Sequence, residues 1–148
     1  MRGSLTKLIN LSAYLKDMDI RSRPEVKFHY ITGQDDAANI LKDLSGIRVL
    51  SARPETRISF QKEETARETL ETVLFVLDKD LDAGKTVQKE CEQYDTLLEL
   101  ADELLGQLRD ACNSCDLLSE LRVTDATVRP EVKLFGSWNG YSISISLS

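Results

Sequence analysis

The sequence contains few of the residues that most often take part in catalysis or that restrict the chain through disulfides and rigid turns. It contains three cysteines, three prolines, one histidine and one tryptophan in 148 residues. An odd cysteine count argues against a closed disulfide framework. The chain also lacks net positive charge, since 25 acidic and 19 basic residues give a formal charge of −6. This acidic balance argues against nucleic acids and anionic membranes as partners, because both are bound through Lys and Arg.

Long hydrophobic runs are absent as well. No apolar stretch approaches the roughly 20 residues of a membrane-spanning helix, and the N-terminal stretch has no apolar block typical of a signal peptide. We therefore expect a cytoplasmic protein, or one incorporated in an assembled particle. Hydrophobic residues still make up 41% of the chain, which is enough for a core. The length predicts a single domain, residues 1–148.

The most regular stretch is residues 85–112, where apolar residues recur in alternating steps of four and three. This heptad pattern predicts one long helix with an apolar seam. The seam either packs on a sheet of the same chain or forms a coiled-coil dimer. We favour the sheet, because the predicted strands each need a cover for one apolar face. The seam consists of Val87, Cys91, Tyr94, Leu98, Ala101, Leu105, Leu108 and Cys112, with Leu97, Leu104 and Ala111 beside it.

The N-terminal third predicts a helix, a strand and a second helix. Apolar residues at helical spacing indicate a helix over residues 4–18. Alternation then predicts a strand over residues 25–31. Asp35 and Asp36 suit the positive end of a short helix, and Gly46 is expected just past its C-terminus.

The middle of the chain predicts a hairpin and contains one ambiguous segment. Strands are expected over residues 47–51 and 57–61, joined by a turn that contains Pro54. Residues 62–82 fit either a helix or a strand. We favour a strand over residues 71–77, preceded by a loop or short helix, because that block is rich in β-branched and aromatic residues.

The C-terminal part predicts the clearest hairpin. A short strand is expected over residues 121–124, followed by strands over residues 131–135 and 140–148. These two strands are joined by a turn over residues 136–140 that contains Asn139-Gly140. The last strand alternates apolar residues with serines, so one side faces the core and the other faces water or a partner. The candidate interface residues are Ser142, Ser144, Ser146 and Trp138.

These elements predict an α+β fold. Its sheet is mostly antiparallel with five to six strands, one long helix packs across a face, and a short helix lies at the N-terminus.

Three local patterns resemble chemical motifs without completing them. Cys112 and Cys115 have C-x-x-C spacing, but they lie at a helix C-terminus, whereas a reactive thiol is favoured at a helix N-terminus. Asp78, Asp80 and Asp82 resemble half a calcium loop that lacks the required Gly and Glu. Residues 84–86 resemble the end of a phosphate-binding loop without its first Gly. We therefore predict no catalytic, cofactor-binding or metal-binding residues.

The order of elements resembles small structural proteins from prophages and phage-like elements of Bacteroidetes. The features that carry the resemblance are the N-terminal helix, the apolar strand from Thr72 to Phe75, the long acidic helix and the closing hairpin around residues 138–145. The order is also similar to that of phage tail-terminator and head–tail connector proteins, whose α+β domains assemble into rings. The resemblance implies a role in virion morphogenesis without enzymatic activity, and no residue role is carried over.

We therefore expect a non-enzymatic assembly module that associates with itself, in a ring oligomer, or with phage structural proteins. Two alternatives stay open. One is a regulatory or interaction protein that dimerises through the helix over residues 85–112. The other is a small-molecule or metal-dependent enzyme that uses the acidic turn or the cysteine pair.

Overall fold

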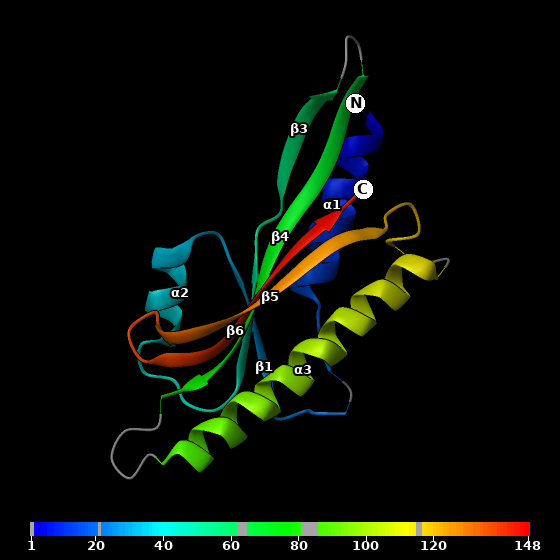
Figure 1. Cartoon of the computed structure of the whole chain (residues 1–148). Coiled ribbons are helices and arrows are strands. Elements are labelled where there is room, and N and C mark those ends of the chain that lie inside the picture. The colour runs from blue at the N-terminus through cyan, green and yellow to red at the C-terminus, as the bar shows by residue number, and fades with distance from the viewer. Residues whose placement is uncertain (1, 21, 62–64, 81–85, 115–116) are drawn as a thin grey trace.

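Six strands form one sheet in the computed structural model, which describes residues 2–20, 22–61, 65–80, 86–114 and 117–148. The strand order is β1-β2-β4-β6-β5, and β3 also pairs with β4 (Figure 1). Only β1 and β2 pair in parallel. The predicted α+β class with a mostly antiparallel sheet and one long helix is confirmed. The elements are α1 (Arg2–Lys16), β1 (Lys27–Ile31), α2 (Gln34–Leu41), β2 (Arg48–Ala52), β3 (Glu55–Gln61), β4 (Thr65–Lys79), α3 (Val87–Asn113), β5 (Val123–Leu134) and β6 (Trp138–Leu147).

The 15-residue strand β4 organises the sheet. Along one edge it pairs first with β3, from Thr65 to Glu71, and then with β2, from Leu74 to Leu77. Along its other edge it pairs with β6, but only from Leu70 onwards. Residues 65–69 of β4 and 57–61 of β3 therefore form a two-stranded arm that extends past the end of β6. Figure 1 shows this arm projecting from the top of the molecule.

The predicted pairing in this region was wrong in two respects. Strands β2 and β3 do not form a hairpin with each other, since both pair with β4. Residues 65–70 belong to a strand, where we expected a loop or short helix. Residues 65–70 are extended because their backbone pairs with β3. The local sequence pattern does not reveal this pairing partner. Residues 62–64 and 81–82 of the ambiguous segment lie outside the described residues.

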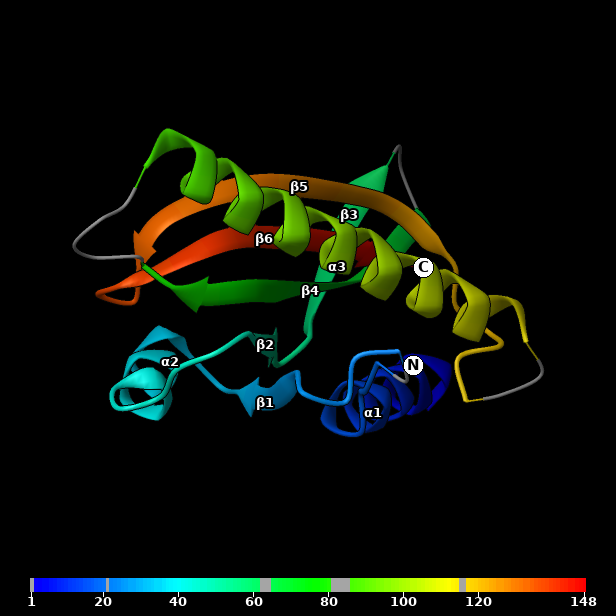
Figure 2. The ribbon, with the colours of Figure 1, turned by 90° about the horizontal axis from the view of Figure 1, so that it is seen from below.

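The two faces of the sheet carry separate cores. On one face, which we call the long-helix face, α1 and α3 cover Val49, Leu74, Val76, Ile143 and Ile145. On the opposite face, the α2 face, Leu50 and Leu77 pack with Ile31, Ala37, Leu41 and Trp138. Figure 2, seen from below, shows α3 running along the β4, β6 and β5 side and α2 near β1 and β2. The α2 face is covered over only part of the sheet.

Helix α3 begins at a side-chain cap and runs for 27 residues. The Thr86 hydroxyl oxygen accepts a hydrogen bond of 3.1 Å from the backbone N–H of Lys89, which satisfies one of the free donors at the helix start. The expectation that the helix packs on the sheet is confirmed. Its buried residues are Gln93, Leu97, Leu100, Ala101, Leu104, Leu108 and Cys112.

The heptad seam was centred on the wrong flank of α3. Val87 is 80% exposed and Leu98 is 44% exposed, whereas Leu97 and Leu104 are fully buried. Adjacent leucines at 97–98 and 104–105 create two overlapping stripes that lie about 100° apart on the helix, and periodicity alone does not choose between them. Seam residues in the C-terminal half of the helix, such as Leu108 and Cys112, are buried because α1 and the segment after α3 also pack there.

The C-terminal strands are longer than predicted. β5 is continuous from Val123 to Leu134, although we expected two pieces, and it accommodates Pro130 because it is an edge strand. The turn lies at residues 135–137, so Asn139 and Gly140 belong to β6 and the Asn-Gly turn was wrong. Gly140 has φ +153, and a Cβ placed there would overlap the carbonyl oxygen of Val76. Position 140 therefore requires glycine, because β6 and β4 lie too close together there for a side chain.

The N-terminal elements agree with the predicted types. The first helix ends at Lys16, two residues earlier than expected, and its stripe residues Leu11 and Leu15 are buried. We had expected Gly46 just past the C-terminus of the second helix. This prediction was wrong, because α2 ends at Leu41. Gly46 takes φ +81 in the turn before β2.

Candidate functional site

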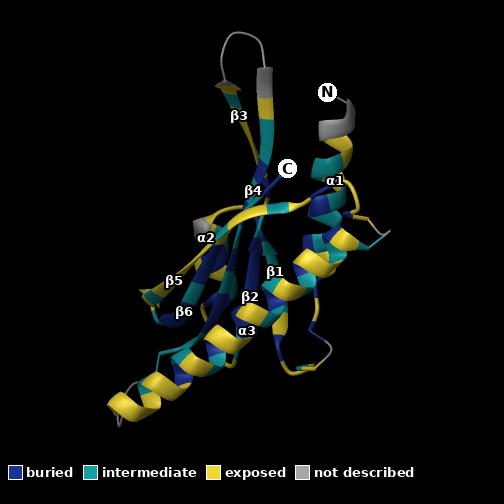
Figure 3. Cartoon of the chain, turned by 45° about the vertical axis from the view of Figure 1, so that its right-hand side comes forward, coloured by how far each residue is buried: buried dark blue, intermediate teal, exposed yellow. Residues whose placement is uncertain are grey.

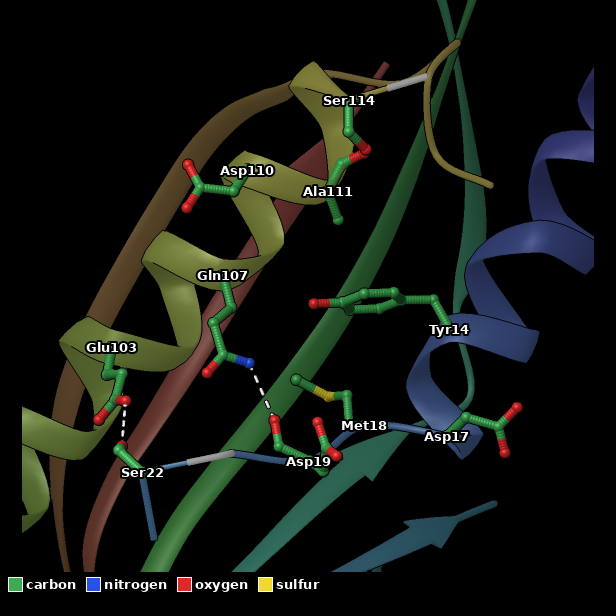
Figure 4. Close-up of a pocket in the computed structure, with 10 residues that line it drawn as sticks. All are labelled: Tyr14, Asp17, Met18, Asp19, Ser22, Glu103, Gln107, Asp110, Ala111 and Ser114. Atoms are coloured by element: carbon green, nitrogen blue, oxygen red, sulfur yellow. Dashed lines mark hydrogen bonds between the residues drawn. The ribbon is translucent and has the colours of Figure 1, made fainter. Parts of the chain in front are cut away.

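An acidic cleft lies between the end of α1 and the C-terminal half of α3 (Figure 4). Its volume is about 550 Å³. The lining residues are Tyr14, Asp17, Met18, Asp19, Ser22, Glu103, Gln107, Asp110, Ala111 and Ser114. Two hydrogen bonds tie its walls together. The Ser22 hydroxyl donates to Glu103, and the Gln107 side-chain amide donates to the carbonyl oxygen of Asp19 over 2.9 Å.

Tyr14 lies at the centre of this cleft, where burial raises its pKa to about 12, with smaller contributions from Cys112, Asp19 and Asp110. The phenol therefore stays protonated in neutral solution, and it supplies no general base. The other titratable groups are four carboxylates, on Asp17, Asp19, Glu103 and Asp110. Among the described residues, no group of three or more His, Cys, Asp or Glu side chains is placed to hold a metal ion. An acidic surface alone does not define a ligand, so the cleft carries no catalytic assignment.

Cys112, the described member of the cysteine pair, does not lie in a reactive setting. Cys112 is buried in the long-helix core, and burial raises the pKa of its thiol, against a smaller opposing effect of Arg122. Cys115 lies outside the described residues, as does Asp82 of the acidic turn and most of residues 84–86. His29 is half-buried, and burial together with the Arg48 guanidinium lowers its pKa.

The serine face of β6 lies partly uncovered on the α2 side of the sheet. Ser144 is exposed and Ser146 is half-buried, and both line a cavity of about 260 Å³ with Arg53, Glu71 and Val73. Ser142 is buried, and its hydroxyl donates a hydrogen bond of 2.9 Å to the Glu131 carboxylate. Only Ser144 and Ser146 therefore have surface to offer a partner.

Trp138, the fourth predicted interface residue, is not on the surface. It is 1% exposed and packs in the α2-face core with Leu77 and Leu41. The prediction placed Trp138 in the turn over residues 136–140. Because the turn lies at residues 135–137, the indole belongs to the strand and points into the core.

The arm formed by β3 and β4 carries an exposed apolar surface that the sequence reading missed. Ile58 is 48% exposed and Phe60 is 84% exposed. Ile58 pairs with Glu68, and Leu70, two residues later on the same face of β4, is buried in the long-helix core. Both exposed side chains therefore lie on the long-helix side of the sheet. The alternation Ile58-Ser59-Phe60 predicted an apolar face for this strand, but it does not show whether a helix covers that face.

The first turns of α1 lie at the same end of the molecule as the arm (Figure 1). Leu5 is 59% exposed and Ile9 is 57% exposed. They are four residues apart and therefore share one flank of the helix. We call Leu5, Ile9, Ile58 and Phe60 the arm patch.

A second exposed apolar group lies where α3 meets β5. The Tyr94 hydroxyl donates a hydrogen bond of 2.6 Å to the carbonyl oxygen of Glu131, which fixes this flank of α3 against β5. Leu98, one turn after Tyr94, is 44% exposed, and Val128 and Val132 of β5 are 39% and 62% exposed. We call Leu98, Val128 and Val132 the flank patch. Figure 3 shows the surrounding solvent side of α3 as a row of exposed residues.

Comparisons with known proteins found no matching family model and no curated protein with a matching sequence. In the part of the chain that the structure describes, no helix is long and apolar enough to cross a membrane.

Proposed function

We propose that this chain is a non-enzymatic assembly module that works by associating with further copies of itself, as a component of a phage-like particle. The observation that carries the proposal is the projecting arm. Two strands extend beyond the sheet and expose Ile58 and Phe60 on one face. The outer edge of β3 faces no other strand in the described sheet, so its backbone groups are open to pairing as well.

Exposed apolar side chains on an open edge favour association. Burying a phenylalanine side chain fully contributes about 1.5–3 kcal/mol. Two paired strands with no further strand or helix packed on them are only marginally stable. The sheet of the same chain therefore stabilises the arm little. A contact with another molecule would stabilise the arm. The phage-like setting rests on the resemblance in the order of elements, and ring formation is part of the same proposal.

A dimer formed through α3 is the second candidate. It is favoured by the partial exposure of Leu98 and the high exposure of Val87 on the flank of the predicted seam. This candidate requires a species of two chains, whereas the assembly module allows larger ones.

The test is the absolute mass in solution, by light scattering after size exclusion, over a concentration series. The wild-type chain is compared with Phe60→Ser and with Leu117→Ser. Leu117 is a matched control because it is 48% exposed and belongs to neither patch. We expect wild type and Leu117→Ser to exceed the monomer mass of 16.7 kDa, and Phe60→Ser to dissociate. A wild-type chain that stays monomeric at every concentration contradicts the proposal.

A further inference from the structure

From the placement of the two exposed patches we infer that the arm patch of one copy docks on the flank patch of the next. The occupant of the flank between α3 and β5 is thus a second copy of this chain. The inference rests on the proposed self-association and names the two surfaces that would make it.

The two patches are unlike in charge. Helix α3 contains seven acidic and two basic residues, a formal charge of −5. Asp95 and Asp102 stand three residues before and four residues after Leu98, so they border the flank patch on the same side of the helix. Helix α1 contains three basic residues and no acidic one; Arg2 and Lys7 belong to the half of the helix that carries Leu5 and Ile9, whereas Lys16 lies at its other end, over the ring of Tyr30. Glu68, an acidic residue of the arm that lies opposite Ile58, has an interaction partner within the same chain.

This charge distribution disfavours pairing of like patches. Two flank patches face to face would bring two acidic α3 helices together, and juxtaposed like charges weaken an interface. An arm patch placed on a flank patch brings the basic α1 toward the acidic α3. The apolar members of both patches then cover each other.

The backbone of β5 also favours docking by side chains. β5 is an edge strand whose residues Val128 and Val132 are exposed, but Pro130 lies between them and has no N–H to donate. Simple extension of the sheet along this edge is therefore interrupted. A projecting arm that brings Phe60 and Ile58 to Leu98 and Val132 does not need an unbroken row of donors.

A contact between two different patches leaves one free patch at each end of a pair. Further copies therefore add in the same way, and the series closes into a ring or continues as a filament, according to the rotation between neighbours. A symmetric dimer is not the expected end state.

The test uses two full-length variants, one for each patch. The arm variant is Ile58→Ser/Phe60→Ser, and the flank variant is Leu98→Ser/Val132→Ser. Thermal unfolding of each variant is compared with that of wild type. If either double variant unfolds, the single substitutions Phe60→Ser and Val132→Ser replace it. Mass is measured for each variant alone and for an equal mixture.

We expect each variant alone to associate at least roughly tenfold more weakly than wild type, as loss of an interface anchor predicts. The mixture keeps one intact contact, because the flank of the arm variant accepts the arm of the flank variant. It should therefore yield a 1:1 dimer and nothing larger. Raising the salt concentration should weaken that dimer, since charge attraction is screened.

If either variant alone assembles like wild type, or if the mixture stays monomeric, the pairing of these two patches is overturned while self-association stands. If wild type itself is monomeric throughout, both the pairing and the proposed function fail.

Discussion

Ile58 of β3 lies opposite Glu68 of β4, beyond the point where the pairing of β6 with β4 ends at Leu147 and Leu70. At this position the sheet consists of two strands, β3 and β4. Ile58 and Phe60 are exposed because no described side chain of β3 belongs to either core, so no helix covers this part of the sheet. The proposed assembly surface is thus the uncovered end of the sheet.

The orientation of α3 is tested by a pair of leucine substitutions. Leu104 is fully buried on the long-helix face, and Leu98 is 44% exposed. Leu104→Ala should lower the free energy of unfolding by about 2–5 kcal/mol, because it leaves a cavity in the core. Leu98→Ala should lower it by about 1 kcal/mol or less. Urea unfolding, with the chain dilute enough to be monomeric, measures both, and equal costs would contradict this packing.

A buried amide joins β5, β6 and the residue that follows β4. The side chain of Asn139 is fully buried, its oxygen accepts a hydrogen bond of 2.9 Å from the N–H of Lys133, and its nitrogen donates to Asp80 over 2.7 Å. Asn139→Ala orphans these groups and should cost about 2 kcal/mol or more. Asn39→Ala, on the exposed side of α2, is the control and should change stability little. A neutral Asn139→Ala would show that the network does not hold this end of the sheet.

Two glycines make opposite predictions. Alanine at Gly140 would overlap the Val76 carbonyl and would also have to adopt φ +153, so Gly140→Ala should destabilise by at least about 3 kcal/mol. Gly106 lies inside α3 with nothing within 4 Å of an added Cβ. Gly106→Ala should therefore stabilise the chain by about 0.5–1 kcal/mol. Thermal unfolding of the two variants should move in opposite directions, and a shift of the same sign would contradict one of these environments.

Tyr14 makes the stability sensitive to alkaline pH. Burial raises its pKa from 10.0 to about 12. The unfolded chain therefore releases this proton before the folded chain does, so stability is full below pH 10 and falls as the pH rises toward 12. Burial also raises the pKa of Tyr141, with Asp95 adding to the effect, and this contributes in the same direction. Tyr14→Phe should make the decline shallower when urea midpoints are measured across this range. An unchanged slope would place Tyr14 in a more exposed setting.

Local sequence patterns predicted the elements better than their partners. The alternation of Ile143 and Ile145 with serines correctly assigned the core side of β6, because a period of two needs no knowledge of neighbours. The predicted hairpin of β2 with β3 was wrong because both strands pair with β4. The residues between them, 52–56, do not indicate this pairing. The seam was centred on Leu98 when Leu97 is the buried residue, because spacing alone does not fix the rotation of α3 about its own axis.

The candidate surfaces were predictable only in part. Ser144 and Ser146 lie on an open side of β6, as the alternation indicated. Trp138 was misplaced, because the Asn-Gly pair suggested a turn over residues 136–140, whereas the turn lies at residues 135–137. The exposure of Phe60 was not predictable, since a strand residue that alternates with serine normally faces a core. It depends on which part of the sheet the helices cover, and the local sequence does not encode this.

The most direct test of assembly through the arm is photo-crosslinking from position 60. Phe60 is replaced by a photoreactive phenylalanine analogue, isotope-labelled and unlabelled chains are mixed, and the crosslinked peptides are mapped by mass spectrometry. We predict adducts between labelled and unlabelled chains that join position 60 to residues of α3 and β5 around Leu98 and Val132. Adducts confined to single chains, at concentrations where the wild-type chain assembles, would contradict the account.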